Sequence, residues 1–136
     1  MKIIKYLIII LIMSVSSYCD LIEIDNLKLQ QMIADGVVVI DIRRQDEFEE
    51  FGIIKGSTQL TFFDKNGNYD VPKWINSFVK LVPTKDTPFA IYCAHANRTK
   101  VVGNFLNKQL EYKNVYELKG GINYGWVDKG FPTVKY

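Results

Sequence analysis

The stretch Phe89-Ala90-Ile91-Tyr92-Cys93-Ala94-His95-Ala96-Asn97-Arg98-Thr99 decides the fold of this chain. Its first four residues are apolar, as in a strand covered on both faces, and the apolar residues after it recur at helical spacing. The sequence therefore predicts a buried strand over 89–92, a turn at Cys93 and a helix from about Thr99 to Leu110. The apolar face expected for this helix consists of Val101, Val102, Phe105, Leu106 and Leu110.

A thiol at a strand-to-helix turn lies next to the first N–H groups of the helix, which have no intrahelical partner and carry partial positive charge. This environment favours the thiolate over the thiol. Arg98, five positions after Cys93, adds a permanent cation whose forked donors suit anionic oxygen or sulfur. The pattern predicts an anion cradle between Cys93 and Arg98. The alternative, a small core cysteine at a strand end, remains open.

The order of a cysteine, four residues, an arginine and a threonine resembles the active-site loop of the rhodaneses, a family of sulfurtransferases. In this chain the loop runs from Cys93 to Thr99, and Ala96 stands where the family commonly has glycine. The resemblance covers about residues 21–136 and includes an Asp-x-Arg after an early strand and a Gly-Gly turn before a tryptophan. Those positions are Asp41, Arg43, Gly120, Gly121 and Trp126.

The resemblance implies that Cys93 is a nucleophile that carries sulfane sulfur as a persulfide, with no metal and no organic cofactor. The residues implied to line the substrate are Ala94, His95, Ala96, Asn97, Arg98 and Thr99. Arg98 would orient a small sulfur-containing anion such as thiosulfate or polysulfide, and Thr99 would cap the helix while donating to the sulfur. The implied acceptor is a thiol, cyanide or a protein thiol. For His95, tuning of the thiolate and an exposed spectator role both remain open.

Asp41 and Arg43 are expected to support the site as a charge pair between loops at the carboxyl edge of the sheet. A second anion contact by Arg43 or Arg44 is the functional alternative. An acidic helix with Asp46, Glu47 and Phe48 is expected to follow.

Two other functions remain open for the cysteine loop. Phosphatases and arsenate reductases of related fold use a loop with five residues between cysteine and arginine, which fits a tetrahedral oxyanion, whereas this loop has four. A domain that only carries or binds sulfur, without turnover, would have the same loop as an enzyme.

The rest of the chain alternates strands with helices, which predicts an α/β fold with a central, mostly parallel five-stranded sheet and helices on both faces. The expected strands are 21–25, 37–40, 58–62, 89–92 and 114–118. Helices are expected from Asp25 or Asn26 to Gly36, and from Pro72 with Trp74, Ile75, Phe78 and Val79 on one face. Ligands in such folds bind beyond the carboxyl ends of the strands.

Composition and the first residues bear on location. The 17 basic and 15 acidic residues give a net charge of +2, so nothing indicates a nucleic-acid surface. Residues 1–19 have a basic start, an apolar run and small residues, the plan of a secretory signal, ahead of one domain over 20–136. We therefore expect a periplasmic protein. Lipidation at Cys19, or an uncleaved segment that anchors the domain at the membrane, are the alternatives.

Overall fold

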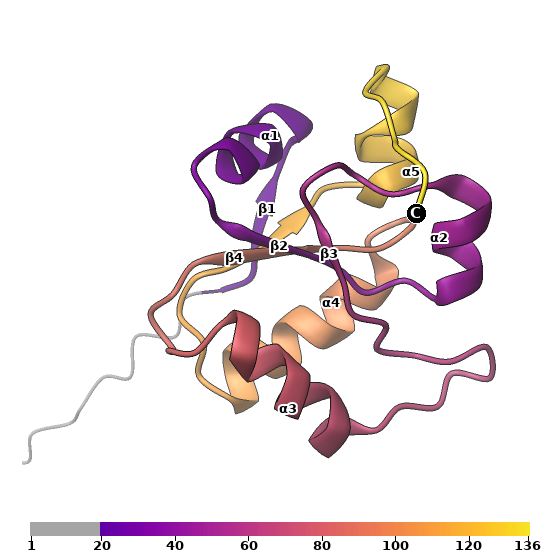
Figure 1. Cartoon of the computed structure of the whole chain (residues 1–136). Coiled ribbons are helices and arrows are strands. Elements are labelled where there is room, and N and C mark those ends of the chain that lie inside the picture. The colour runs from indigo at the N-terminus through magenta and orange to yellow at the C-terminus, as the bar shows by residue number, and fades with distance from the viewer. Residues whose placement is uncertain (1–19) are drawn as a thin grey trace, which may run out of the picture.

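The computed structural model describes residues 20–136, which form a five-stranded sheet between two layers of helices (Figure 1). The expected signal segment and Cys19 lie outside the described residues. The elements in chain order are β1 (Ile22–Ile24), α1 (Asn26–Ala34), β2 (Val38–Asp41), α2 (Gln45–Phe51), β3 (Thr58–Gln59), α3 (Val71–Leu81), β4 (Phe89–Tyr92), α4 (Asn97–Asn104), the π-helical turn η1 (Phe105–Gln109), β5 (Val115–Leu118), α5 (Gly121–Gly125) and the 3-10 turn η2 (Val127–Lys129).

The strands lie in the order β1-β5-β4-β2-β3, and every neighbouring pair is parallel. β4 is the middle strand, and all four of its residues are buried. In register, Ile91 of β4 lies between Ile40 of β2 and Glu117 of β5. The predicted α/β class with a parallel five-stranded sheet is confirmed, and the strand that ends at Cys93 is its centre.

Each face of the sheet is covered by its own apolar layer. In Figure 1, α3 and α4 lie below the sheet and α1 and α5 lie above it. The lower layer includes Trp74, Phe78, Val102 and Leu106, and the upper layer includes Leu29, Met32, Ile122 and Trp126. Because both faces are covered, β4 must be apolar throughout, and its chemistry begins only where the strand ends.

Two helices begin directly after a capping aspartate, α1 at Asn26 and α3 at Val71, one residue before the expected start at Pro72. Asp25 caps α1 by accepting a hydrogen bond from the backbone N–H of Lys28, and Asp70 caps α3 by accepting one from Lys73. Pro72 is in the first turn of α3, where its missing N–H costs nothing. Trp74 and Phe78 are buried as expected, whereas Val79 is exposed.

The expected strand over 58–62 is too long, because β3 contains only Thr58 and Gln59. The chain beyond it still donates two hydrogen bonds to the β2 side, from Leu60 to Asp41 and from Phe62 to Ile42. The ring of Phe62 packs in an aromatic cluster with Phe63, Tyr69 and Trp74. The regular strand therefore ends before this aromatic cluster begins.

The helix after Cys93 begins at Asn97, two residues earlier than expected, and continues as a π-helical turn from Phe105. Its buried positions are Thr99, Val102, Gly103, Leu106 and Asn107, at the spacing of one helical face. Val101, which the sequence placed on that face, is 60% exposed. The prediction was wrong at Val101 because the polar Thr99 occupies a core-facing position.

Candidate active site

The sulfur of Cys93 lies directly beyond the carboxyl end of the central strand. Its side chain is only 1% exposed, and it packs with Ile91 and Val102 on the face covered by α4. One hydrogen-bonding partner is Thr99, whose hydroxyl oxygen lies 3.7 Å from the sulfur and accepts from the thiol. The thiol therefore sits at the base of its loop, beneath the start of α4.

The loop between Cys93 and α4 turns through a left-handed residue. Ala96 has φ of 65°, a conformation that costs a residue with a Cβ about 1–2 kcal/mol. Alanine thus takes the path that glycine would take without strain, and the four-residue spacing to Arg98 is kept. Among residues 20–136, no backbone acceptor receives the N–H groups of residues 94–99 outside the helix itself. Since the first N–H groups of a helix have no internal partner, these amides are free to bind an anion.

The start of α5 holds this loop from the other side. The backbone N–H of Ile122 donates to the Cys93 carbonyl at 2.8 Å, and that of Asn123 donates to the Ala94 carbonyl at 3.0 Å. Gly121 has φ of 67°, and a Cβ there would lie 2.4 Å from the Ala94 oxygen. The Gly-Gly turn is therefore required for the close approach that turns the loop carbonyls away toward α5.

Arg98 is bound by a glutamate that the sequence analysis did not assign to the site. Its two terminal nitrogens each donate to a carboxylate oxygen of Glu47 in α2, both at 2.7 Å. The hydrogen bond to Glu47 raises the pKa of Arg98, and the neighbouring Cys93 raises it further. Burial alone would raise the pKa of Glu47, but the contacts with Arg98 and Arg44 together outweigh burial and lower it. The acidic helix α2 follows β2 and begins at the carboxyl edge of the sheet, the same edge at which β4 ends. This shared position is the signal that could have identified Glu47.

Asp41 and Arg43 form a buried ion pair at the end of β2, with 2.7 Å between Arg43 Nη2 and Asp41 Oδ2. The same nitrogen donates to the Gly52 carbonyl at 2.8 Å, so the pair joins two loops. Burial tends to lower the pKa of Arg43, but the hydrogen bond and charge of Asp41 raise it overall. Arg44 instead pairs with Asp46 near the surface. These contacts leave Arg43 no exposed donor for a second anion.

His95 and Asn97 are exposed, and Ala94 is partly buried. The Nε2 atom of His95 lies 3.0 Å from the side-chain nitrogen of Asn123, and its ring packs on Tyr124 with 4.6 Å between ring centroids. His95 thus belongs to the rim, together with α5. The sequence analysis had not identified Asn123 as a partner of His95.

Thr99 is placed differently from the prediction. Its hydroxyl donates to Glu117 Oε2 in β5 at 2.7 Å and accepts from the Cys93 thiol. It neither donates to the sulfur nor caps α4, because the N-cap position is Ala96. The correction has a simple cause: a hydroxyl has one hydrogen, and a buried carboxylate takes it. Glu117 was missed because it interrupts an otherwise apolar strand and carries no motif.

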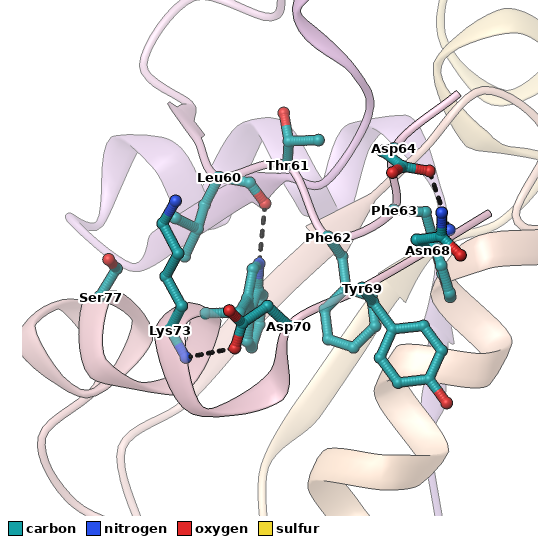
Figure 2. Close-up of a pocket in the computed structure, with 11 residues that line it drawn as sticks. Leu60, Thr61, Phe62, Phe63, Asp64, Asn68, Tyr69, Asp70, Lys73 and Ser77 are labelled. Atoms are coloured by element: carbon teal, nitrogen blue, oxygen red, sulfur yellow. Dashed lines mark hydrogen bonds between the residues drawn. The ribbon is translucent and has the colours of Figure 1, made fainter. Parts of the chain in front are cut away.

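A separate hollow lies between the 60–70 loop and the start of α3 (Figure 2). Its volume is about 470 Å³, and Figure 2 shows the Phe62 and Tyr69 rings on one side of it and Lys73 and Ser77 on the other. Cys93 is not among its lining residues, so the hollow is not the sulfur site.

Residues 20–136 contain no group of three or more histidine, cysteine or acidic side chains that could hold a metal ion. In the same part of the chain, none of the helices has the length and apolar character needed to cross a bilayer.

The parallel sheet and the cysteine loop at the end of its central strand define an α/β protein whose candidate site lies at the carboxyl edge of the sheet. The model of the rhodanese-like domain matches residues 25–129, and the chain belongs to that family.

Named relatives agree with this assignment. A rhodanese domain-containing protein of Drosophila melanogaster is 30% identical over 95 residues, which cover 68% of this chain and 84% of that protein. The tRNA uridine(34) hydroxylase of Pelagibacter ubique is 36% identical over 101 residues, which cover 74% of this chain and 30% of the hydroxylase. This chain therefore spans less than a third of the hydroxylase.

Among solved structures, the polysulfide-sulfur transferase homodimer of Wolinella succinogenes has a TM-score of 0.64 at 19% identity. The match covers 86% of this chain and 80% of that one. At this identity, the likeness shows a shared fold.

Proposed function

We propose that this domain is a sulfurtransferase that receives a sulfane sulfur on Cys93 and passes it to a thiophilic acceptor. The observation that carries the proposal is the spacing of the loop. Four residues separate Cys93 from Arg98 at the end of the central strand. The backbone N–H groups of residues 94–99 donate to no backbone acceptor of residues 20–136 outside the helix. A ring of amides of this size suits one anionic sulfur atom.

The reaction is a double displacement. The Cys93 thiolate attacks the outer sulfur of thiosulfate, the sulfur–sulfur bond of the donor breaks, and sulfite leaves with the electron pair. The product on the protein is a persulfide anion. An acceptor thiolate, or cyanide, then attacks the outer sulfur, and Cys93 leaves as a thiolate. Polysulfide serves as donor by the same step, with a shorter polysulfide as the leaving group.

A non-turnover persulfide carrier is the second candidate, and the burial of Cys93 favours it. With the side chain 1% exposed, a donor or acceptor reaches the sulfur only past the loop and its rim. Slow exchange of this kind suits a domain that holds sulfur until one protein partner collects it. Phosphatase chemistry ranks below both, because its loop needs one residue more than this chain has.

The proposed setting is the periplasm, and the support for it is the signal-like pattern of residues 1–19. Retention of that segment would instead place the same domain at the membrane surface, facing the periplasm.

The test is sulfur uptake by a chain in which Cys93 is the only thiol. The sequence has two cysteines, so Cys19→Ser leaves Cys93 alone. After treatment with thiosulfate or polysulfide, we expect the intact mass to rise by one sulfur atom, and the added sulfur to map to the peptide with Cys93. Cyanide should remove the sulfur as thiocyanate.

The matched control is the same chain with Cys93→Ser, which should gain nothing. Sulfur gained by that control, or none gained by the Cys93 chain, would overturn the proposal. Repeated turnover with thiosulfate and cyanide supports the enzyme, whereas a single stoichiometric loading supports the carrier. Hydrolysis of an aryl phosphate without sulfur uptake would point to the phosphatase.

A further inference from the structure

A buried carboxylate from β5 lies two hydrogen bonds away from the sulfur. The side chain of Glu117 is 1% exposed and faces α4. Its Oε2 accepts from the Thr99 hydroxyl at 2.7 Å, and its Oε1 accepts from Lys100 Nζ at 2.6 Å. The Thr99 oxygen in turn accepts from the Cys93 thiol. The three side chains form one directed chain that runs from sulfur to carboxylate.

The direction of this chain follows from the hydrogens available. Thr99 has a single hydroxyl hydrogen, and an ionised carboxylate at 2.7 Å is a stronger acceptor than a sulfur at 3.7 Å. While Glu117 holds that hydrogen, Thr99 presents only lone pairs to Cys93. A Cys93 thiol can donate its proton to those lone pairs. A thiolate or a persulfide anion has no proton to donate, so two acceptors would face each other.

The surrounding charges hold the Glu117 side chain in place. Lys100 bridges Glu117 and Glu23, which are register partners on β5 and β1, and these two contacts raise the pKa of Lys100. Arg98 also faces the sulfur, because its pKa is raised first by the hydrogen bond to Glu47 and then by the charge and hydrogen bond of Cys93. The partners of the nearby His95 and Asp41 are Asn123 and Arg43, respectively.

We propose that Glu117 is a positioning residue that orients the Thr99 hydroxyl as a hydrogen-bond acceptor toward the resting Cys93 sulfur and so withholds a hydrogen-bond donor from that sulfur. This inference rests on the proposed function, because it adds a step to the loading of sulfur on Cys93. When the sulfur becomes anionic, the Thr99 hydrogen turns from Glu117 to the sulfur, and Glu117 keeps Lys100 as its partner. Loading of the site is thereby coupled to the release of one hydrogen bond in β5.

The experiment measures the alkylation of Cys93 by iodoacetamide across neutral pH in the Cys19→Ser chain. Glu117→Gln removes the ionised acceptor and supplies an amide N–H that can donate to Thr99, which frees the Thr99 hydrogen for the sulfur. We expect alkylation at neutral pH to become faster by about tenfold or more, the effect of one charge-assisted hydrogen bond. Thiolate absorbance in the ultraviolet, referenced to Cys93→Ser, gives the same answer without depending on access to the sulfur.

Variants of Thr99 separate positioning from a simple charge effect. In a Thr99→Val background, Glu117→Gln should change nothing, because the hydroxyl that transmits the effect is absent. In a Thr99→Ser background the acceleration should return. Equal acceleration in all three backgrounds would mean that the Glu117 charge acts through space, and the proposal would be wrong.

The alkylation rates of three variants, Glu117→Gln, Glu117→Asp and Glu23→Gln, decide the result. Slower or unchanged alkylation in Glu117→Gln overturns the proposal, and a slower rate would make Glu117 the base that removes the thiol proton. Glu117→Asp, which withdraws the carboxylate by one carbon, should accelerate alkylation in the same direction and serves if the glutamine variant does not fold. Glu23→Gln, which removes the other partner of Lys100, should leave the rate unchanged. Sulfur uptake is not read here, so failure of the proposed function would appear separately.

Discussion

Two arginines near the cysteine loop are each bound by a carboxylate, but they differ in burial. Arg43 is 1% exposed, whereas the Arg98 side chain is 22% exposed. Arg43 donates to both oxygens of Asp41 and to the Gly52 carbonyl. Arg98 uses its two terminal nitrogens on Glu47 and still has hydrogens on the solvent side.

The difference separates a structural arginine from one that can bind a ligand. A buried ion pair held by several hydrogen bonds is rigid, and its loss leaves the remaining partner unpaired in a low dielectric. A partly exposed arginine such as Arg98 is held by its carboxylate partner in one orientation and can still receive an anion. The comparison predicts that changes at Arg43 act on stability and changes at Arg98 act on donor binding.

The largest effect is expected for Arg43→Met. It leaves Asp41 buried and uncompensated, so the free energy of unfolding should fall by about 3–5 kcal/mol. Urea unfolding followed by circular dichroism measures the change. The double variant Asp41→Leu/Arg43→Met, which removes both charges, should recover much of the loss. A loss below about 1 kcal/mol in the single variant would contradict the structural assignment.

Arg98→Lys is expected to act mainly on the reaction. Lysine keeps the charge but lacks the fork, so it cannot hold Glu47 and an anionic donor together. We expect kcat/KM for thiosulfate to fall by about tenfold to a hundredfold, through KM, with a small change in stability. Thiosulfate:cyanide kinetics and urea unfolding, run side by side, measure both. A large loss of stability with an unchanged KM would reverse the roles of the two arginines.

The sequence predicted the central strand, the loop and the two arginines because each depends on local pattern. The apolar run 89–92 indicated a strand buried on both faces, and Asp41 and Arg43 are only two residues apart. The spacing of Cys93 and Arg98 within one loop was equally readable. What these features share is that their partners are close in the chain.

The two glutamates of the site were missed because their partners are distant in the chain. Glu47 reaches Arg98 across 51 positions, and Glu117 reaches Thr99 across 18. The direction of the Thr99 hydrogen bond depends on Glu117, so it was predicted wrongly for the same reason. The predicted burial of Val101 was also wrong. Which helix residues are buried depends on which of them face the sheet, and Thr99 takes one of those positions.

Glu47→Gln tests the carboxylate partner of Arg98 through the pH dependence of stability. The lowered pKa of Glu47 means that its contribution to stability is complete above its ordinary value of 4.5 and is lost as the pH falls through the lowered value. The glutamine variant should therefore lose less stability than the wild type between about pH 5 and pH 3. Urea midpoints across this range measure the difference, expected at about 1 kcal/mol. Identical acid limbs would mean that Arg98 does not stabilise Glu47 in solution.

Arg44→Ala should have the smallest effect, and it isolates burial as the cause of the contrast. Arg44 forms the same kind of contact as the other two arginines, with 3.0 Å between its Nε and Asp46 Oδ1, but both side chains are at least one-third exposed. Solvent screening leaves such a pair about 0–1 kcal/mol, so urea midpoints and thiosulfate kinetics should both stay close to wild type. A stability loss as large as that of Arg43→Met would show that ion pairing itself, and not burial, makes an arginine structural in this fold. A rise in KM would instead mean that Arg44 takes part in binding the donor, the alternative that the sequence left open.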